Sequence, residues 1–271
     1  MDYMAYFNNM PQQMIDAMSL EAFPETLPAI FAFLLCSTLG FLLYIWALRV
    51  MAREGQDVYP LYMHCWMLSI DFIGTITFWT LMFQYDFFWM FTLYGICLPI
   101  WMCLELRCIY FAIKDPQSRQ DEFGLITKEP VTTSQALLYC AGTWAVSFTV
   151  NMYILSCLGG FDNCAIFLLY MITNNVIIYW SWRYWREHAT MDGYRSHNAM
   201  GVQIIMLIQV TIQWIPGLSW YLAVSPFFNQ PWFYAMGIVC SLVQAYNLYM
   251  TMKTPAKPDS VSIVPGKKPI W

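Results

Sequence analysis

Charged residues are scarce in this chain, and this scarcity limits what kind of protein it is. Asp, Glu, Lys and Arg make up 11% of the 271 residues, whereas 59% are hydrophobic. Soluble domains carry roughly 25% charged residues, so the composition argues against an ordinary soluble domain. The formal net charge of −4 also argues against a nucleic-acid partner, which would need a basic surface. We therefore expect the lipid bilayer, and no nucleic acid, as a partner.

Sequence patterns that bind metals are also missing. The chain has nine cysteines but no CxxC pair, and its three histidines, His64, His188 and His197, are far apart in the sequence. We therefore predict no metal centre. Cys157 and Cys164 flank a predicted turn and would be able to form a disulfide if that side of the membrane is oxidising.

Long apolar runs dominate what is present. Each is long enough for a helix of about 20 residues, which crosses a hydrocarbon core of about 30 Å. A helix satisfies its own backbone hydrogen bonds in lipid, so the sequence predicts an all-α bundle of seven transmembrane helices. The seven runs cover residues 27–50, 59–83, 87–113, 134–158, 163–185, 199–222 and 231–252.

Basic residues are absent from every second connection between these runs. The first 48 residues and the connections at 84–86, 159–162 and 223–230 contain no Lys or Arg. Cytosolic loops are enriched in these residues, so we predict an external or lumenal amino terminus and a cytosolic carboxy terminus. The expected organisation is an external or lumenal segment (1–26), a transmembrane domain (27–252) and a disordered cytosolic tail (253–271). In a eukaryote the expected membrane is the endoplasmic reticulum.

Two carboxyl groups are predicted at membrane depth, where ionisable residues are costly to bury and often functional. Asp71 follows Pro60 by eleven residues, which places it roughly 16 Å into the second helix. Glu105 lies about 12 Å above the cytosolic end of the third. Both are candidate catalytic residues facing one cavity. The alternatives are that Asp71 only bonds to a neighbouring helix and that Glu105 pairs with Arg107 or another basic group near the cytosolic face. His64 is expected to be a rim residue near the interface.

Amide and indole side chains suggest a polar, aromatic-lined pocket. Amides inside transmembrane helices often only join neighbouring helices, and that alternative stays open. Tryptophans at the ends of runs, such as Trp220, are expected to be interfacial anchors. The candidate substrate-binding residues are Trp66, Trp101, Trp144, Asn151, Asn174, Gln209, Gln213, Trp214, Gln244 and Asn247.

The stretch LGFLLYIWALRVMAREGQDVYPLYMHCWMLSID, which ends at Asp71, resembles the opening of the membrane terpene cyclases of fungal meroterpenoid and indole-diterpene pathways. Asp71 matches a family acid that is usually Glu, and Trp101 with Glu105 matches a Trp followed by an acid. The basic segment from Arg186 through Gly193 to Arg195 is a looser match. The last helix departs from the family pattern: it lacks the second acid, and Gln244 or Asn247 would stand in its place.

This resemblance implies a seven-helix protein that cyclises a prenylated substrate without redox chemistry, metal or other cofactor. In that chemistry a buried acid protonates an epoxide or olefin, and aromatic walls stabilise the carbocation that forms. Neither a DDxxD nor a DxDD motif is present, which argues against diphosphate ionisation. The alternatives are a seven-helix transporter or receptor for a small amphiphilic ligand, and a scaffold subunit of a membrane complex. The sequence leaves the oligomeric state open.

Overall fold

The computed structural model describes residues 3–54, 57–123, 130–161, 163–182, 185–186 and 197–255, and in these residues it contains helices and no strand. The segment between Arg186 and Arg195 lies almost wholly outside the described residues, as does the predicted tail beyond residue 255. Each of the seven predicted runs contains a helix. These helices are α2 (Leu27–Glu54), α3 (Leu61–Gln84), α4 (Trp89–Lys114), α6 (Thr133–Cys157), α7 (Ile166–Trp180), α8 (His197–Ile212) and α10 (Pro231–Lys253).

Four of these helices, α2, α3, α4 and α6, are long and apolar enough to cross a membrane, and α7 and α8 contain shorter apolar segments. This supports the expectation of an all-helical membrane protein. The outward surface agrees, because the side chains of Leu138, Val146 and Tyr153 on α6 are each more than 65% exposed. A large exposed apolar surface is unusual for a soluble monomer but suits contact with lipid.

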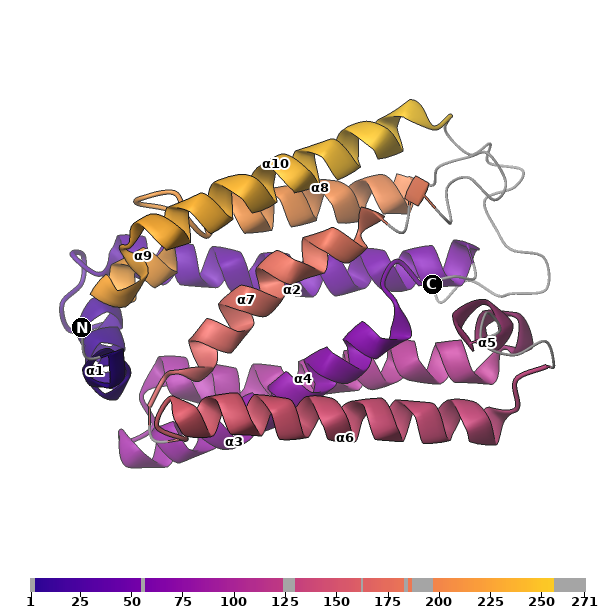
Figure 1. Cartoon of the computed structure of the whole chain (residues 1–271). Coiled ribbons are helices and arrows are strands. Elements are labelled where there is room, and N and C mark those ends of the chain that lie inside the picture. The colour runs from indigo at the N-terminus through magenta and orange to yellow at the C-terminus, as the bar shows by residue number, and fades with distance from the viewer. Residues whose placement is uncertain are drawn as a thin grey trace.

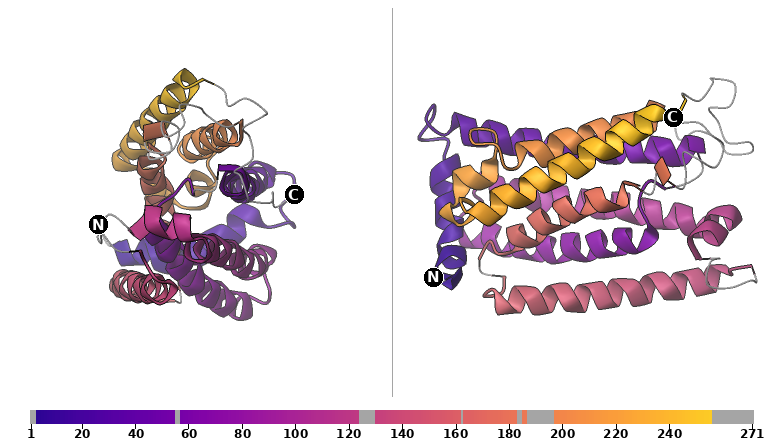
Figure 2. Two further views of the ribbon diagram at one scale, coloured as in Figure 1. Left: turned by 90° about the vertical axis from the view of Figure 1, so that its right-hand side faces the viewer. Right: turned by 45° about the horizontal axis from the view of Figure 1, so that its top comes forward.

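The long helices form two groups with α7 between them. Helix α3 packs against α4 and α6, whereas α8 packs against both α2 and α10. Helix α7 crosses diagonally between the two groups and contacts α3, α8 and α10 (Figures 1 and 2). Helix α3 is the most buried of the four candidate spans, at 56% of its apolar window against 17% for α6. The residues of α3 are therefore placed to face the interior of the bundle.

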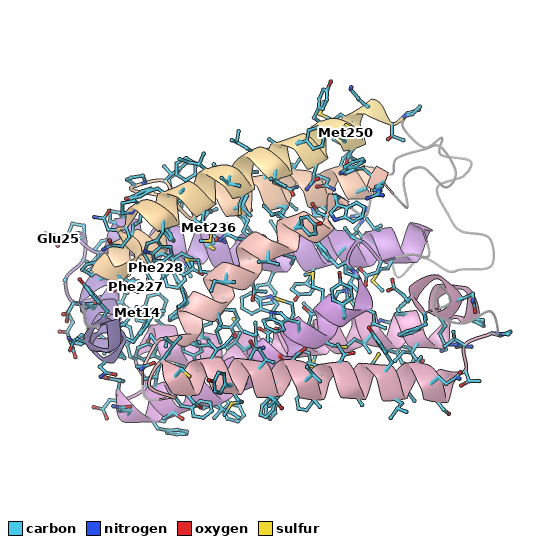
Figure 3. The ribbon with its side chains drawn as sticks, in the orientation of Figure 1. Met14, Glu25, Phe227, Phe228, Met236 and Met250 are labelled. Carbon is cyan, nitrogen blue, oxygen red and sulfur yellow. The ribbon has the colours of Figure 1, made fainter. Side chains whose placement is uncertain are left out.

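Short helices close the two ends of the bundle. At one end lie α1 (Tyr3–Met18), α9 (Trp220–Val224) and the 3-10 helix η2 (Pro226–Phe228); at the other lies α5 (Pro116–Phe123) (Figure 1). Helix α1 buries Met10, Met14 and Met18, which share one face because they are four residues apart. Met14, Phe227 and Phe228 lie close together at this end in Figure 3, and all three belong to one buried cluster.

The predicted run 199–222 is not one helix, and Pro216 explains the difference. Helix α8 ends at Ile212 and α9 begins at Trp220. Proline has no backbone N–H to continue a helix, and Gly217 adopts a left-handed φ of 81° that favours glycine. The Ser219 side chain then accepts a hydrogen bond from the Leu222 N–H and caps α9. This break turns Trp220 inward instead of leaving it at the surface.

The connection between the predicted runs 87–113 and 134–158 contains a helix, α5. Arg119 on α5 donates hydrogen bonds from Nη1 to the carbonyl groups of Ile113 and Lys114, at 2.6 and 3.0 Å. These carbonyls belong to the last turn of α4. The carbonyl groups of a helix's last turn have no N–H group within the helix to bond to. Arg119 therefore holds α5 against the end of α4. Helix α6 then begins with a capping box formed by Thr132 and Gln135.

Candidate functional site

A cavity lies between the two helix groups. Its volume is about 90 Å³, well above the roughly 10–15 Å³ that one buried water needs. The wider space between its walls, open solvent at the mouth included, is about 860 Å³. Helices α2, α3, α4, α7, α8 and α9 all contribute to the lining. The cavity is therefore assembled from most of the bundle and not from one local segment.

Asp71 lies on the cavity wall at the middle of α3, and its side chain is 1% exposed. Its Oδ2 atom has no hydrogen-bond partner among the described residues. The Tyr170 hydroxyl on α7, which lines the same cavity, donates to the carbonyl of Ile70 at 3.5 Å. Because buried polar atoms normally have partners, an unpaired carboxyl oxygen at a cavity points to a group that a ligand would contact.

Glu105 lines the same cavity from α4 and is also buried. Its Oε1 accepts a hydrogen bond from the Tyr44 hydroxyl on α2, and its Oε2 contacts Nδ1 of His64 on α3. Arg107 is not its partner. The guanidinium of Arg107 lies over the rings of Tyr110 and Phe111, at 5.7 and 5.1 Å from their centroids. Glu105 therefore does not pair with Arg107, and the basic group that it contacts is His64, which fits the alternative of pairing with another basic group.

Aromatic side chains supply much of the remaining wall. Trp101 stacks on Phe41 with ring centroids 4.8 Å apart, and Trp220 stacks on Tyr221 at 4.1 Å. Trp101, Trp220 and Tyr221 line the cavity together with Tyr94. The prediction that Trp220 is an interfacial anchor is wrong, because Trp220 is 2% exposed and faces the cavity. Sequence reasoning missed it because the residue lies at the end of an apolar run, where anchors are common.

Two predicted amides, Asn174 of α7 and Gln209 of α8, also line the cavity. Only some of the site residues predicted from the sequence line this cavity. Asp71, Glu105, Trp101, Asn174 and Gln209 come together at one cavity, whereas Trp66, Trp144, Asn151, Gln213, Trp214, Gln244 and Asn247 are not part of its lining.

Several of the remaining residues join helices in the α3, α6 and α7 region. The Asn151 side chain donates to the Ser69 hydroxyl at 2.8 Å, linking α6 to α3. Trp66 donates from Nε1 to the Thr173 hydroxyl at 3.2 Å, linking α3 to α7. Trp144 stacks on Phe148 of its own helix. These contacts favour the interpretation of Trp66 and Asn151 as interhelical links.

The predicted amides of the last helix lie in a separate polar cluster. Gln244 donates from Nε2 to Gln203 Oε1 at 2.6 Å and accepts from the Ser181 hydroxyl at 2.9 Å. Asn247 donates to the same hydroxyl at 2.8 Å and accepts from Trp185 at 3.0 Å. These bonds join α10 to α8 and to the segment after α7.

The remaining two residues lie nearer the α8–α9 turn. Trp214 donates from Nε1 to the Ser241 hydroxyl on α10 at 2.9 Å. The side chain of Gln213 is buried, and neither of its amide atoms has a hydrogen-bond partner among the described residues.

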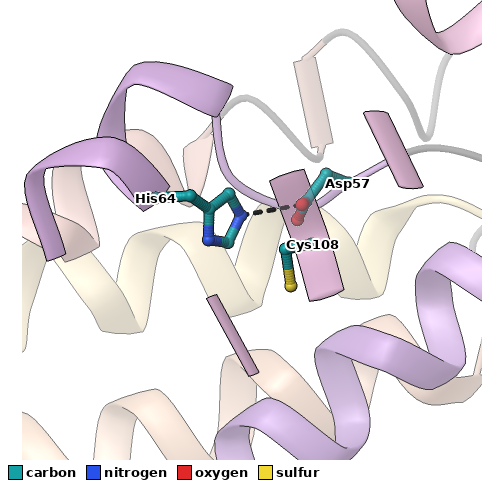
Figure 4. A group of neighbouring side chains, drawn as sticks. All are labelled: Asp57, His64 and Cys108. Carbon is teal, nitrogen blue, oxygen red and sulfur yellow. Dashed lines mark ion pairs between the residues drawn. The ribbon is translucent and has the colours of Figure 1, made fainter. Parts of the chain in front are cut away.

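His64 occupies an interior position that the sequence did not suggest. It is 2% exposed, so its assignment as a rim residue is wrong. Its Nδ1 faces Glu105, and its Nε2 lies 2.7 Å from Oδ2 of Asp57, in the segment before α3. Cys108 of α4 is close to this pair (Figure 4). One feature of the sequence could have indicated this interior position: His64 precedes Asp71 by seven residues and therefore shares its helical face.

The cysteines are free thiols in this structure. Cys157 and Cys164, which the sequence offered as a disulfide pair, are not bonded to each other: Cys157 is exposed and Cys164 is buried.

Comparison of the chain with models of known protein families, with curated proteins and with solved structures finds no match. What the cavity does must therefore be argued from its own residues. Two buried carboxyl groups, one hydrogen-bonded on both oxygens and one with an unpaired oxygen, face aromatic walls.

Proposed function

We propose that the chain is a membrane terpene cyclase whose cavity binds the prenyl chain of an amphiphilic substrate. Asp71 is the general acid. It protonates an epoxide oxygen or an olefin carbon of the substrate, and Glu105 supports the site from the neighbouring helix α4. Supporting roles in positioning the substrate fall to Trp101, Asn174 and Gln209, because these predicted residues line the cavity.

The observation that carries this proposal is the unpaired Oδ2 of Asp71 at an aromatic-lined cavity. An uncharged carboxylic acid is far less costly to bury than a carboxylate, so a buried Asp without a cationic partner is expected to hold its proton. A protonated carboxyl group that faces a cavity is able to give that proton to a bound substrate. General acid catalysis of this type contributes about 10²–10⁴-fold to a rate.

Glu105 is suited to a different role. Both of its oxygens are engaged, by Tyr44 and by His64, so its carboxyl group has less freedom to act on a substrate. Its contacts with Tyr44 and His64 instead hold α2, α3 and α4 together around the cavity. This arrangement assigns proton donation to Asp71 and positioning to Glu105.

The reaction is an isomerisation in which every proton is accounted for. The proton of Asp71 adds to the substrate, a C–O or C=C bond opens, and a carbocation forms. A neighbouring double bond captures this cation and closes a ring, while the faces of Trp101 and Trp220 stabilise the positive charge. Loss of a proton from an adjacent carbon to the Asp71 carboxylate then restores the acid. The product has the same mass as the substrate.

The proposal includes the membrane topology expected from the sequence. Helices α2, α4, α7 and α10 run toward one end of the bundle, and α3, α6 and α8 run back (Figure 1). Lys114 and Lys253 lie in the last turns of α4 and α10, at the same end. We place this end in the cytosol and the end capped by α1 and α9 outside or in the lumen, with seven crossings in all. In a eukaryote this membrane is the endoplasmic reticulum.

A seven-helix transporter or receptor is the second candidate. Two carboxyl groups and several aromatic faces around one cavity would also suit an amphiphilic cation such as a long-chain ammonium compound. Such a protein would bind its ligand without changing it, which separates the two candidates experimentally.

The test is expression of the chain in a host that makes epoxidised farnesyl and geranylgeranyl aromatic compounds. We expect a new product of unchanged mass with one or more additional rings, detected by chromatography with mass spectrometry and identified by NMR. The matched control is the Asp71→Asn variant at equal membrane abundance. If the wild-type protein binds these compounds but returns them unchanged, the cyclase proposal is wrong and the binding or transport function is favoured.

A further inference from the structure

Three buried side chains from different parts of the chain place metal-ligating atoms together at the α5 end of α3 and α4. They are Asp57, His64 and Cys108, and their ligand atoms all lie within 4.8 Å of one another (Figure 4). Their exposed fractions are 8%, 2% and 0%. The sequence-based expectation of no metal centre rested on the wide spacing of the histidines, but this cluster needs only one.

Local structure orients each of the three groups. Oδ1 of Asp57 accepts the backbone N–H of Tyr59 at 3.1 Å, and Oδ2 lies toward His64. His64 is in the first turn of α3. Cys108 follows Glu105 by three residues on α4, so both are on the same face of that helix. The thiol and the carboxyl group of α4 therefore approach the same imidazole ring.

The hydrogen bonding of His64 indicates that a cation belongs at its Nε2 atom. Nδ1 faces Glu105 Oε2, which acts as the acceptor for an Nδ1–H group. If His64 is neutral, Nε2 then carries a lone pair, and this lone pair faces the carboxylate oxygen of Asp57 at 2.7 Å. Two lone pairs at this separation repel unless a proton or a metal ion lies between them. A shared proton would involve only the His64 nitrogen and the Asp57 oxygen. The sulfur of Cys108 is a third potential metal ligand at the same place, which favours a metal ion over a proton.

We propose that Asp57, His64 and Cys108 form a binding site for a divalent transition metal, with zinc as the best match. Zinc takes nitrogen, oxygen and thiolate ligands in tetrahedral sites, at about 2.0–2.3 Å. Ligand atoms around such an ion are roughly 3.3–3.8 Å apart, so each donor would shift by less than about 1 Å. The carboxylate and a thiolate together balance the two positive charges.

Glu105 is the outer partner of this site. Histidines that ligate metals commonly donate their other ring N–H to a carboxylate, which fixes the tautomer and the ring orientation. The contact between Glu105 and His64 has this form. Three protein ligands leave a fourth position for water, as in many zinc sites that are not purely structural. His64 and Glu105 line the same cavity as Asp71, but Asp71 is not one of the ligands, so metal binding is measurable without the proposed cyclisation.

The test is metal binding by the purified full-length protein in detergent after treatment with a chelator. We expect about one Zn²⁺ per chain, measured by elemental analysis of the desalted protein. Co²⁺ in place of Zn²⁺ should produce a thiolate-to-cobalt charge-transfer band and the visible bands of a tetrahedral ion. Cys108→Ser should abolish the charge-transfer band, and Asp57→Asn should weaken Zn²⁺ binding on the order of tenfold or more.

Two further variants keep the test decisive. Cys103→Ser removes an exposed thiol from the same helix and should leave binding unchanged. Glu105→Gln removes no ligand but should weaken binding by about 10–100-fold, the usual effect of losing an outer carboxylate. Thermal unfolding of each variant verifies that it is folded. Absence of stoichiometric metal in folded wild-type protein, or binding that survives Cys108→Ser and Asp57→Asn unchanged, would overturn the proposed metal site.

Discussion

His64 and Glu105, which are 41 positions apart in the sequence, are joined by a side-chain contact inside the bundle. Because His64 also contacts Asp57, and Glu105 also accepts a hydrogen bond from Tyr44, this contact connects the segment before α3 to α2 and α4. Both residues line the cavity that contains Asp71. A buried polar chain of this kind determines how these helices are positioned around the cavity.

Asp71→Asn tests the proton donor. The amide keeps the volume of the side chain but cannot deliver a proton, so we expect a rate loss on the order of 10²–10⁴-fold with folding retained. Asp71→Glu should keep part of the activity because it keeps the acid. Glu105→Gln should reduce the rate less than Asp71→Asn does, since Glu105 positions the site. Product formation and thermal stability are measured on the same purified variants. Full activity in a folded Asp71→Asn protein would rule out the mechanism.

Tyr44→Phe tests the hydrogen bond to Glu105. Removal of the hydroxyl leaves a buried carboxyl oxygen without its donor, which costs about 1–3 kcal/mol. We expect a lower thermal unfolding temperature in detergent. Tyr110→Phe is the matched control, because Tyr110 is on α4 but its side chain is half exposed, and this variant should unfold like the wild type. Equal stability of the two variants would contradict the importance of the Tyr44–Glu105 bond.

Gly237→Ala tests the packing of α10 on the turn after α8. A Cβ atom at Gly237 would collide with the Trp214 side chain, including its Cβ, so we expect destabilisation of about 1–3 kcal/mol. Gly142→Ala is the control: no heavy atom lies within 4 Å of the added methyl group there. Alanine in a helix interior is favoured over glycine by roughly 0.5–1 kcal/mol, so this variant should be as stable as the wild type or more stable. Thermal unfolding in detergent separates the two outcomes.

Gln244→Leu tests whether the amides of α10 are structural. The substitution removes hydrogen bonds to Gln203 and Ser181. Interhelical hydrogen bonds in membranes contribute about 0.6 kcal/mol on average and up to about 1.7, so a loss of stability in this range is expected. Activity per folded molecule should be unchanged, because Gln244 does not line the cavity. A specific loss of activity in a fully stable variant would restore Gln244 to the substrate site.

The topology is tested with reporters fused to the two ends of the chain. We expect a reporter after residue 271 to be cytosolic and one before residue 1 to be lumenal or external, because the basic residues concentrate at alternate connections. Glycosylation and protease protection of intact membranes provide the measurement. Two ends on the same side would contradict the seven crossings.

The apolar runs were enough to locate the long helices, because each run is far longer than a typical β-strand, which leaves a helix as the expected element. The run 27–50 became α2, and 231–252 became α10 with only small changes at the ends. The run 199–222 failed as one helix because apolar composition does not register the effect of Pro216 on the backbone. Asp71 and Glu105 are both buried inside the bundle, and their positions along α3 and α4 follow directly from the rise per residue.

The sequence by itself determined that this chain is apolar and helical and that polar groups occur within its apolar runs. Tertiary structure alone decided which of them meet. Asn174 and Gln209 reach the cavity, whereas Gln244 and Asn247 bond to a different set of helices. His64, Asp57 and Cys108 come together from two helices and the segment before α3. The physical reason is that these helices are apolar on all sides, so hydrophobicity does not determine how each helix is rotated about its own axis. Packing and hydrogen bonds with neighbouring helices set that rotation, and with it the direction of each side chain.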